Sequence, residues 1–318
     1  MKIINQIINI YLCEIKKIYD GFEDNTIINI ILFEMANFNY KEKNFYFHLI
    51  NSNDKYKEIK NQLILFNDKT KIMSHIYKEE NGQLFEDLIK NKFSKQLIKK
   101  IKDHLRHIYF MFQTKHYNKI NTLFETFKNE LINNQEIKLN NLLSVHSSTY
   151  ERKNFYEEFY NKINEFVNLN ECESIMDLGC GFNPFSYTYF NLNNKKLYLN
   201  ELNTNDLNIL KRLSQVYKLK FNTNTKIIEK NIFEIEKFEK VDICFLLKIL
   251  QTLEYTKRNF TKKLIENINA KYLIVSFSTQ SLSGRKIYSN REWFEKIINK
   301  YKYETFEIFN EIIYIITK

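Results

Sequence analysis

The 318-residue chain is poor in the residues that interrupt regular backbone, with only five glycines and one proline. Three of the glycines and the proline fall in two short segments of the C-terminal half: Gly179, Gly181, Pro184 and Gly284. Glycine is needed where the backbone adopts a positive φ or comes very close to a ligand. We therefore predict that these segments are turns with a specific purpose.

Cysteine and long apolar runs are also scarce. The four cysteines are spread along the chain: Cys13, Cys172, Cys180 and Cys244. They show neither CxxC nor metal-ligand spacing, so we expect reduced thiols, a cytoplasmic protein and no metal site. The apolar run Ile27–Phe33 ends at Glu34, well short of the roughly 20 residues of a membrane helix. Asn5 and Gln6 interrupt any signal-peptide core, so we expect neither membrane insertion nor secretion.

The net charge of +10 is distributed unevenly. Residues 1–90 are nearly balanced, whereas residues 91–120 contain one acidic residue, Asp103, among eight lysines and arginines. On the helix predicted there, four basic residues share one face: Lys95, Lys99, Lys102 and Arg106. We call these four residues the basic stripe. Such a stripe is suited to RNA phosphates, although a solvated helix face in a lysine-rich chain is an alternative interpretation.

The chain changes its periodicity near residue 170. Before that point apolar residues recur every three or four positions, which predicts an all-helical region. From Ser174 onward, five short apolar runs alternate with amphipathic segments, which predicts an α/β, Rossmann-like parallel sheet with helices on both faces. Two further runs, Tyr303–Phe309 and Ile312–Ile316, predict a C-terminal antiparallel hairpin with its turn at Asn310-Glu311. We expect a helical extension (1–90), a helical RNA-binding domain (91–170) and a ligand-binding domain (171–318).

The first predicted strand leads directly into the glycine turn, in the sequence SIMDLGCGFNPF (Ser174–Phe185). Ligands of open α/β sheets bind at the carboxyl ends of the strands, and Gly179 and Gly181 would let the backbone approach one closely. Asp177 is expected to orient the loop or to accept from an ammonium group. The turn is not a dinucleotide fingerprint, because Pro184 replaces the third glycine. A tight turn without a ligand is the alternative interpretation.

Two further strand ends fit a bound nucleoside. Glu201 follows the second strand, about 20 residues after the glycine turn, where a carboxylate can accept from both ribose hydroxyls. Asn231 and Ile232 follow the third strand and are expected to flank the adenine. Together with the glycine turn, they predict an S-adenosyl-L-methionine-dependent methyltransferase.

Three other segments narrow the prediction. They are HSSTYER (His146–Arg152), FLLKIL (Phe245–Leu250) and SFSTQSLSGR (Ser276–Arg285). In their order and spacing, and together with GCGFNPF, they resemble the aminoglycoside-resistance 16S ribosomal RNA (guanine-N7) methyltransferases. The resemblance covers residues 95–318 and implies a class I methyltransferase sheet.

The resemblance also implies roles for individual residues. Nine are expected to bind the cofactor S-adenosyl-L-methionine: His146, Thr149, Arg152, Asp177, Gly179, Gly181, Glu201, Asn231 and Ile232. Of these, Arg152 would lie near the methionine carboxylate. Lys248, Ser276 and Arg285 are expected to be catalytic, facing the RNA and the target base. Gln280 would also contact the RNA, as would the basic stripe, although the family usually has a basic residue at the position of Gln280.

The implied partner is 16S rRNA in the small (30S) ribosomal subunit, methylated at N7 of the decoding-site guanine, with aminoglycoside resistance as the result. Guanine N7 carries a lone pair and no proton, so the absence of a general-base constellation is consistent with this chemistry. Two alternatives stay open. One is a methyltransferase for another RNA site or substrate, and the other is a catalytically silent RNA- or ribosome-binding protein with the same fold. The oligomeric state is left open.

Overall fold

The computed structural model describes residues 2–17, 27, 28, 30, 31, 34, 92–108, 114, 116–279 and 291–318. The chain forms two compact units, Met1–Met111 and Phe112–Lys318. The boundary between the two units falls within residues 91–170, and the expected division into three functional parts (1–90, 91–170 and 171–318) stays a prediction. Within the described residues, no helix combines the length and apolar character needed to cross a membrane.

In the first unit, helix α1 (Lys2–Lys16) packs against helix α7 (Lys92–Ile108). The hydroxyl groups of Tyr11 and Ser94 share a hydrogen bond of 2.8 Å between the two helices. The apolar face of α7 is buried, as the periodicity of the sequence predicts: Leu97, Ile98, Ile101 and Leu105.

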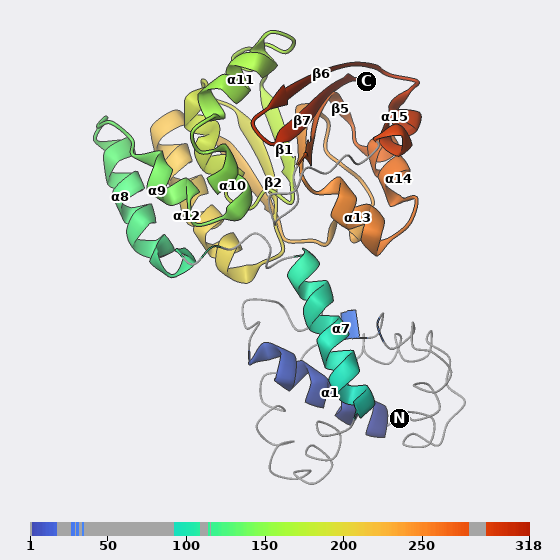
Figure 1. Ribbon diagram of the computed structural model, residues 1–318. Coiled ribbons are helices and arrows are strands. Elements are labelled where there is room, and N and C mark those ends of the chain that lie inside the picture. The colour runs from blue at the N-terminus through green and yellow to red at the C-terminus, as the bar shows by residue number, and fades with distance from the viewer. Residues whose placement is uncertain are drawn as a thin grey trace. The chain divides into compact units, whose positions relative to one another are not determined.

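The second unit is built on a seven-stranded sheet in the order β3-β2-β1-β4-β5-β7-β6 (Figure 1). The strands are β1 (Ser174–Leu178), β2 (Lys196–Asn200), β3 (Asn224–Ile228), β4 (Val241–Leu247), β5 (Ala270–Ser278), β6 (Lys302–Ile308) and β7 (Glu311–Thr317). Strands β1 to β5 pair in parallel, and β7 pairs antiparallel with both β5 and β6. The predicted Rossmann-like sheet with a C-terminal antiparallel hairpin is confirmed.

Alternate residues of the central strands point to two hydrophobic layers, because side chains in a strand alternate between its faces. On β1, Ile175 belongs to the layer that includes α8 (Ile120–Ile132), α9 (Leu139–Leu143), α11 (Tyr156–Asn164) and α12 (Thr204–Phe221). Its neighbour Met176 belongs to the layer that includes α13 (Leu250–Thr256), α14 (Phe260–Asn267) and α15 (Glu292–Ile298). The sheet is therefore covered by helices on both faces, as expected (Figure 1).

The remaining elements are short: η2 (Tyr117–Lys119), α10 (Ser147–Arg152), η3 (Asn183–Tyr189) and η4 (Ile232–Glu234). The segment Asn183-Pro184-Phe185 begins the 3-10 helix η3, with Pro184 in its first turn.

The C-terminal hairpin turns one residue earlier than predicted. Ile308 pairs with Glu311, so the two turn residues are Phe309 and Asn310, and Glu311 is the first residue of β7. Phe309 adopts a positive φ of 50°, a conformation that hairpin turns usually reserve for glycine or asparagine. Nothing in the sequence signals a phenylalanine in that role. As a result, the Glu311 carboxylate belongs to the sheet and not to the turn.

Candidate active site

The glycine turn follows β1 at the carboxyl edge of the parallel strands. Gly179 and Gly181 have φ values of +63° and +49°, which side-chain-bearing residues rarely adopt. A Cβ on Gly179 would lie 2.1 Å from Cδ1 of Ile249, and one on Gly181 would lie 3.0 Å from the ring of His146. Both positions therefore require glycine for backbone conformation and for close packing within the protein.

Glu201, directly after β2, holds this turn. Its Oε2 accepts from the backbone N–H of Gly181 at 3.0 Å. Its Oε1 accepts from the N–H groups of Leu202 and Asn203 at 2.7 and 3.1 Å. Burial raises the pKa of Glu201, and the three donors partly offset that effect because they favour the carboxylate. The expected ribose-binding residue is thus fixed by backbone before any ligand contact.

Asn200 is a residue of this site that the sequence analysis missed. Its Oδ1 accepts from the N–H of Gly179 at 3.3 Å, and its Nδ2 donates to the carbonyls of Ile228 and Lys230 at 2.9 and 2.8 Å. One side chain at the end of β2 therefore connects the turn after β1 with the end of β3 and the loop that follows it. The signal was present, since a buried amide beside Glu201 at a strand end needs partners.

The two residues expected at the adenine follow β3. Asn231 precedes η4, and its Oδ1 accepts from the N–H of Phe233 at 3.1 Å. Ile232 is 5% exposed and packs in the layer of α13, α14 and α15. Asn231 thus anchors the loop through its side-chain carbonyl oxygen, the group that could also accept from the amino group of an adenine. A carbonyl oxygen has two lone pairs, so both contacts are compatible.

Asp177 lies beneath the turn and is 1% exposed. Its Oδ2 accepts from Nδ2 of Asn183 at 2.8 Å and from the hydroxyl of Tyr187 at 2.7 Å. Burial disfavours the charged carboxylate and raises the pKa of Asp177 to about 6, although the two donors oppose the shift. These contacts fit the first of its two expected roles, which is to orient the loop.

Helix α10 contains the HSSTYER segment apart from its first residue, His146. His146 precedes it, is 7% exposed, and shares a hydrogen bond of 2.9 Å between its Nδ1 and Oγ of Ser148. Burial and the neighbouring Arg152 lower the pKa of His146 to about 3, so its imidazole is neutral. Thr149 is fully buried and donates to the carbonyls of Leu143 and His146. These two hydrogen bonds therefore stabilise the start of α10.

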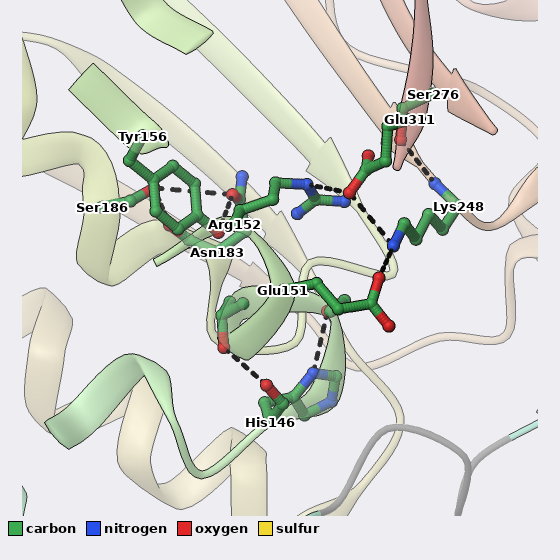
Figure 2. Close-up of polar contacts among 11 residues, drawn as sticks. His146, Glu151, Arg152, Tyr156, Asn183, Ser186, Lys248, Ser276 and Glu311 are labelled. Atoms are coloured by element: carbon green, nitrogen blue, oxygen red, sulfur yellow. Dashed lines mark hydrogen bonds and ion pairs between the residues drawn. The ribbon is translucent and has the colours of Figure 1, made fainter. Parts of the chain in front are cut away.

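Arg152 ends α10 and enters a cluster of buried and partly buried charges (Figure 2). Its Nε donates to Oε1 of Glu311 at 2.8 Å. The same oxygen lies 3.0 Å from Nζ of Lys248, and that ammonium also donates to Glu151. We call Glu151, Arg152, Lys248 and Glu311 the charge cluster. It joins α10, the residue after β4, and the start of β7.

Ser276 fixes the main chain of Lys248. The N–H of Lys248 donates to both the carbonyl and Oγ of Ser276, each at 3.1 Å. Lys248 has a positive φ of 59°, which turns the chain away from β4 directly after Leu247. The structure thus brings two of the three expected catalytic residues together, and Ser276 acts on Lys248 through the main chain.

The charge cluster contains two buried atoms without a hydrogen-bond partner, Nη2 of Arg152 and Oε2 of Glu311. Buried polar groups are rarely left unpaired, so each such atom calls for an explanation. A donor on a buried guanidinium suits a carboxylate ligand such as that of the methionine part of the cofactor. The described residues therefore fit the expected cofactor at this end of the site.

Several predicted residues cannot be placed here. Gln280 and Arg285 lie outside the described residues. The basic stripe lies on α7, in the first compact unit, where Lys95 and Lys99 are exposed and Lys102 is half-buried. The side chain of Arg106 lies outside the described part of the chain.

The charge cluster also contains two residues that the sequence analysis did not name as site residues. Glu151 stood within HSSTYER but was not singled out. Glu311 carries no motif, because its partner Arg152 is 159 positions away in the sequence.

Comparison with known proteins identifies the family of the chain. The model of the family described as "Ribosomal RNA methyltransferase (FmrO)" matches residues 133–315. A 16S rRNA (guanine(1405)-N(7))-methyltransferase from Micromonospora rosea is 28% identical over 186 residues. The matched part covers 55% of this chain and 64% of that protein, less than two thirds of its length. A protein of the same name from Frankia casuarinae is 24% identical over 182 residues, covering 55% of this chain and 62% of its own.

Solved structures show the same fold. The 16S rRNA methyltransferase RmtF, in complex with S-adenosyl-L-homocysteine, superposes with a TM-score of 0.59 at 21% identity, covering 74% of this chain and 89% of its own. The 16S rRNA methylase RmtB superposes with a TM-score of 0.61 at 16% identity, covering 98% of each chain. The fold is therefore that of the class I methyltransferases. Because the family model matches more than half of the sequence, the chain belongs to the FmrO family of ribosomal RNA methyltransferases.

Proposed function

We propose that the protein is an S-adenosyl-L-methionine-dependent methyltransferase of 16S rRNA in the small ribosomal subunit, acting at N7 of the decoding-site guanine. The observation that carries the proposal is the family match over residues 133–315, which includes every described cofactor and catalytic candidate of the second unit. Such an enzyme acts where ribosomes are, in the cytoplasm. Its product would protect the ribosome against aminoglycosides.

In this proposal, some of the described residues bind the cofactor and others orient the target base. Gly179 and Gly181 bring main chain to the carboxyl edge of the sheet, and Glu201 is fixed there to accept from ribose hydroxyls. Arg152 offers its Nη2 to a carboxylate. Bound S-adenosyl-L-methionine supplies an electrophilic sulfonium methyl group. The charge cluster lies at the adjoining strand ends, where a target base would be presented.

This reaction requires little acid–base chemistry from the protein. Guanine N7 has an exposed lone pair and loses no proton when it is methylated, so alignment of the reacting atoms supplies the rate enhancement. The neutral, buried His146 is consistent with a packing role and not with a proton-transfer role. Lys248 and Ser276 would position the base, together with Arg285 and Gln280 on the RNA side.

Recognition of the subunit requires contacts away from the reacting base. Phosphate contacts fix the position of a protein on RNA, and the basic stripe is suited to making them. Lys95 and Lys99 are exposed on α7, as such contacts require. Shape recognition by the helical region would therefore precede placement of the guanine.

The test uses purified protein, S-adenosyl-L-methionine as methyl donor, and 30S subunits from an aminoglycoside-sensitive bacterium. Calorimetry with S-adenosyl-L-homocysteine should show binding, and reduction followed by aniline cleavage should give a strand break at the decoding-site guanine. Cofactor binding with methylation elsewhere would support the alternative of another RNA site. Absence of cofactor binding would support the catalytically silent alternative and contradict the proposal.

A further inference from the structure

Glu311 has an unusual position among the charges of the second unit. It is 3% exposed, and a single oxygen, Oε1, lies within 2.8 Å of Nε of Arg152 and 3.0 Å of Nζ of Lys248. Figure 2 shows the carboxylate between the two cations, with Arg152 and Lys248 arriving from different directions. One carboxylate therefore neutralises two side chains that come from separate elements.

The hairpin places Glu311 at this point. Glu311 is the first residue of β7 and pairs with Ser278, the last residue of β5. Because β7 runs antiparallel to β5, its first residue lies at the carboxyl edge of the parallel strands, where ligands bind. The turn is fixed there by a hydrogen bond of 2.7 Å from the N–H of Thr279 to the carbonyl of Asn310.

Burial of these charges is costly unless they stay paired. Burial alone would raise the pKa of Glu311, but the nearby Arg152 and Lys248 lower it, so the carboxylate is ionised. Lys248 also forms an ion pair with a second carboxylate, that of Glu151, which is partly exposed. For Arg152 within the described residues, Glu311 is the carboxylate that forms an ion pair. Loss of the Glu311 charge would thus leave Arg152 without its ion-pair partner and Lys248 with one carboxylate, Glu151.

We propose that Glu311 is a positioning residue for methyl transfer, which holds the guanidinium of Arg152 for the cofactor and the ammonium of Lys248 for the target base. The inference rests on the proposed function, which gives Arg152 and Lys248 those roles. Glu311 acts through the two cations. Because one oxygen serves both, Glu311 links cofactor binding to placement of the base.

A stabilising role alone explains the arrangement poorly. Buried ion pairs contribute little net stability, and well-packed apolar residues often replace them at no cost. What the charge of Glu311 adds is a fixed orientation of the two cations that it contacts. The Nε contact leaves Nη2 of Arg152 without a partner, and that atom is the donor expected to meet the methionine carboxylate.

The test compares Glu311→Gln, which keeps the shape and removes the charge, with the control Glu307→Gln. Glu307 is exposed on β6 of the same hairpin, so its substitution should leave binding and catalysis unchanged. Glu311→Gln should weaken S-adenosyl-L-homocysteine binding by roughly tenfold to a hundredfold, the cost of a lost charged hydrogen bond. It should also lower kcat on 30S subunits. A lower melting temperature with wild-type affinity and kcat would overturn the proposal.

A double-mutant cycle separates positioning from general destabilisation. In an Arg152→Gln background, Glu311→Gln should weaken S-adenosyl-L-homocysteine binding by less than about threefold, because the residue it orients is gone. An undiminished loss in that background would overturn the proposal. If Glu311→Gln does not fold, Glu311→Asp keeps the charge but shortens the reach, and it should lower kcat while retaining the fold. Wild-type kinetics for Glu311→Asp would contradict the inference.

Failure of the proposed function would be recognised separately. A wild-type protein that binds no S-adenosyl-L-homocysteine, or that methylates no 30S subunit, refutes the proposed function before any variant is made. An active wild-type enzyme whose Glu311→Gln variant behaves identically refutes only the role of Glu311.

Discussion

At the scale of single residues, Asp177 combines a buried position with an ionisable group. Burial raises its pKa from the ordinary value of 3.8 to about 6, whereas in the unfolded chain it titrates at the ordinary value. Between those values the folded protein keeps a proton that the unfolded chain has released. Protonation therefore favours the folded state, and this contribution to stability is lost as the pH rises from about 4 to about 6.

We expect the Asp177→Asn variant to lose this pH dependence. A shift of about two pKa units corresponds to about 3 kcal/mol, so the free energy of unfolding of the wild type should fall by about that amount, relative to the variant, between about pH 3 and about pH 7. Above about pH 7 the difference should stay constant. Urea denaturation of both proteins at four pH values measures it. Parallel stability curves for the two proteins would show that Asp177 titrates normally.

A second prediction at the scale of single residues concerns Glu201. Its carboxylate accepts three backbone N–H groups and, in the proposed function, the ribose hydroxyls as well. Glu201→Ala should weaken binding of S-adenosyl-L-homocysteine by about 1–3 kcal/mol, the value of a hydrogen bond to a charged group. Calorimetry on the folded variant gives the answer, and wild-type affinity would exclude the ribose contact.

At the scale of elements, the β1 turn depends on glycine for two separate reasons. Gly179→Ala introduces a Cβ at a φ of +63° and within 2.1 Å of the Ile249 side chain. The conformational strain alone costs about 1–2 kcal/mol. We expect chemical denaturation to show at least that loss. In an Ile249→Ala background the packing conflict disappears, so the loss should shrink to the conformational part. A variant as stable as the wild type would mean that the turn relaxes freely.

The elements themselves were largely predictable, because strand and helix periodicities are local properties of the sequence. The runs at β1 to β5 and the antiparallel hairpin followed from alternation of short apolar segments. Phe309 could not be predicted in its turn, since its positive φ contradicts the local preference of phenylalanine and shifted the expected turn by one residue. Tertiary pairing of β7 with β5 decides that register.

The site was predictable to the extent that its residues follow strand ends. Gly179, Gly181 and Glu201 could be placed because topology brings the carboxyl ends of parallel strands together. The partners of Arg152 could not be placed in this way. Glu311 lies 159 positions from Arg152, and only the antiparallel return of β7 brings the two charges into contact. Long-range ion pairs without a motif leave no local trace in one sequence.

At the scale of the whole molecule, the basic stripe and the candidate active site lie in different compact units. The basic stripe lies on α7 in the first unit, and the glycine turn and charge cluster lie in the second. If the stripe binds RNA phosphates, changing it should affect subunit binding without affecting the cofactor. Substitutions in the first unit can therefore be tested for their effect on subunit binding, with cofactor binding by the second unit as the control.

The double variant Lys95→Gln/Lys99→Gln removes two exposed charges of the stripe. Each lost phosphate contact should reduce the slope of log affinity against log salt by about 0.7–0.9, so the double variant should bind 30S subunits with a slope smaller by roughly 1.5. Affinity for S-adenosyl-L-homocysteine should not change. The matched control Lys237→Gln/Lys240→Gln removes two exposed charges from the segment that leads into β4, at the amino edge of the sheet, and should leave the slope unaltered. Filter binding across a salt series measures both slopes. Equal slopes for the two double variants would mean that α7 presents a solvated face, and that the subunit is held by other parts of the chain.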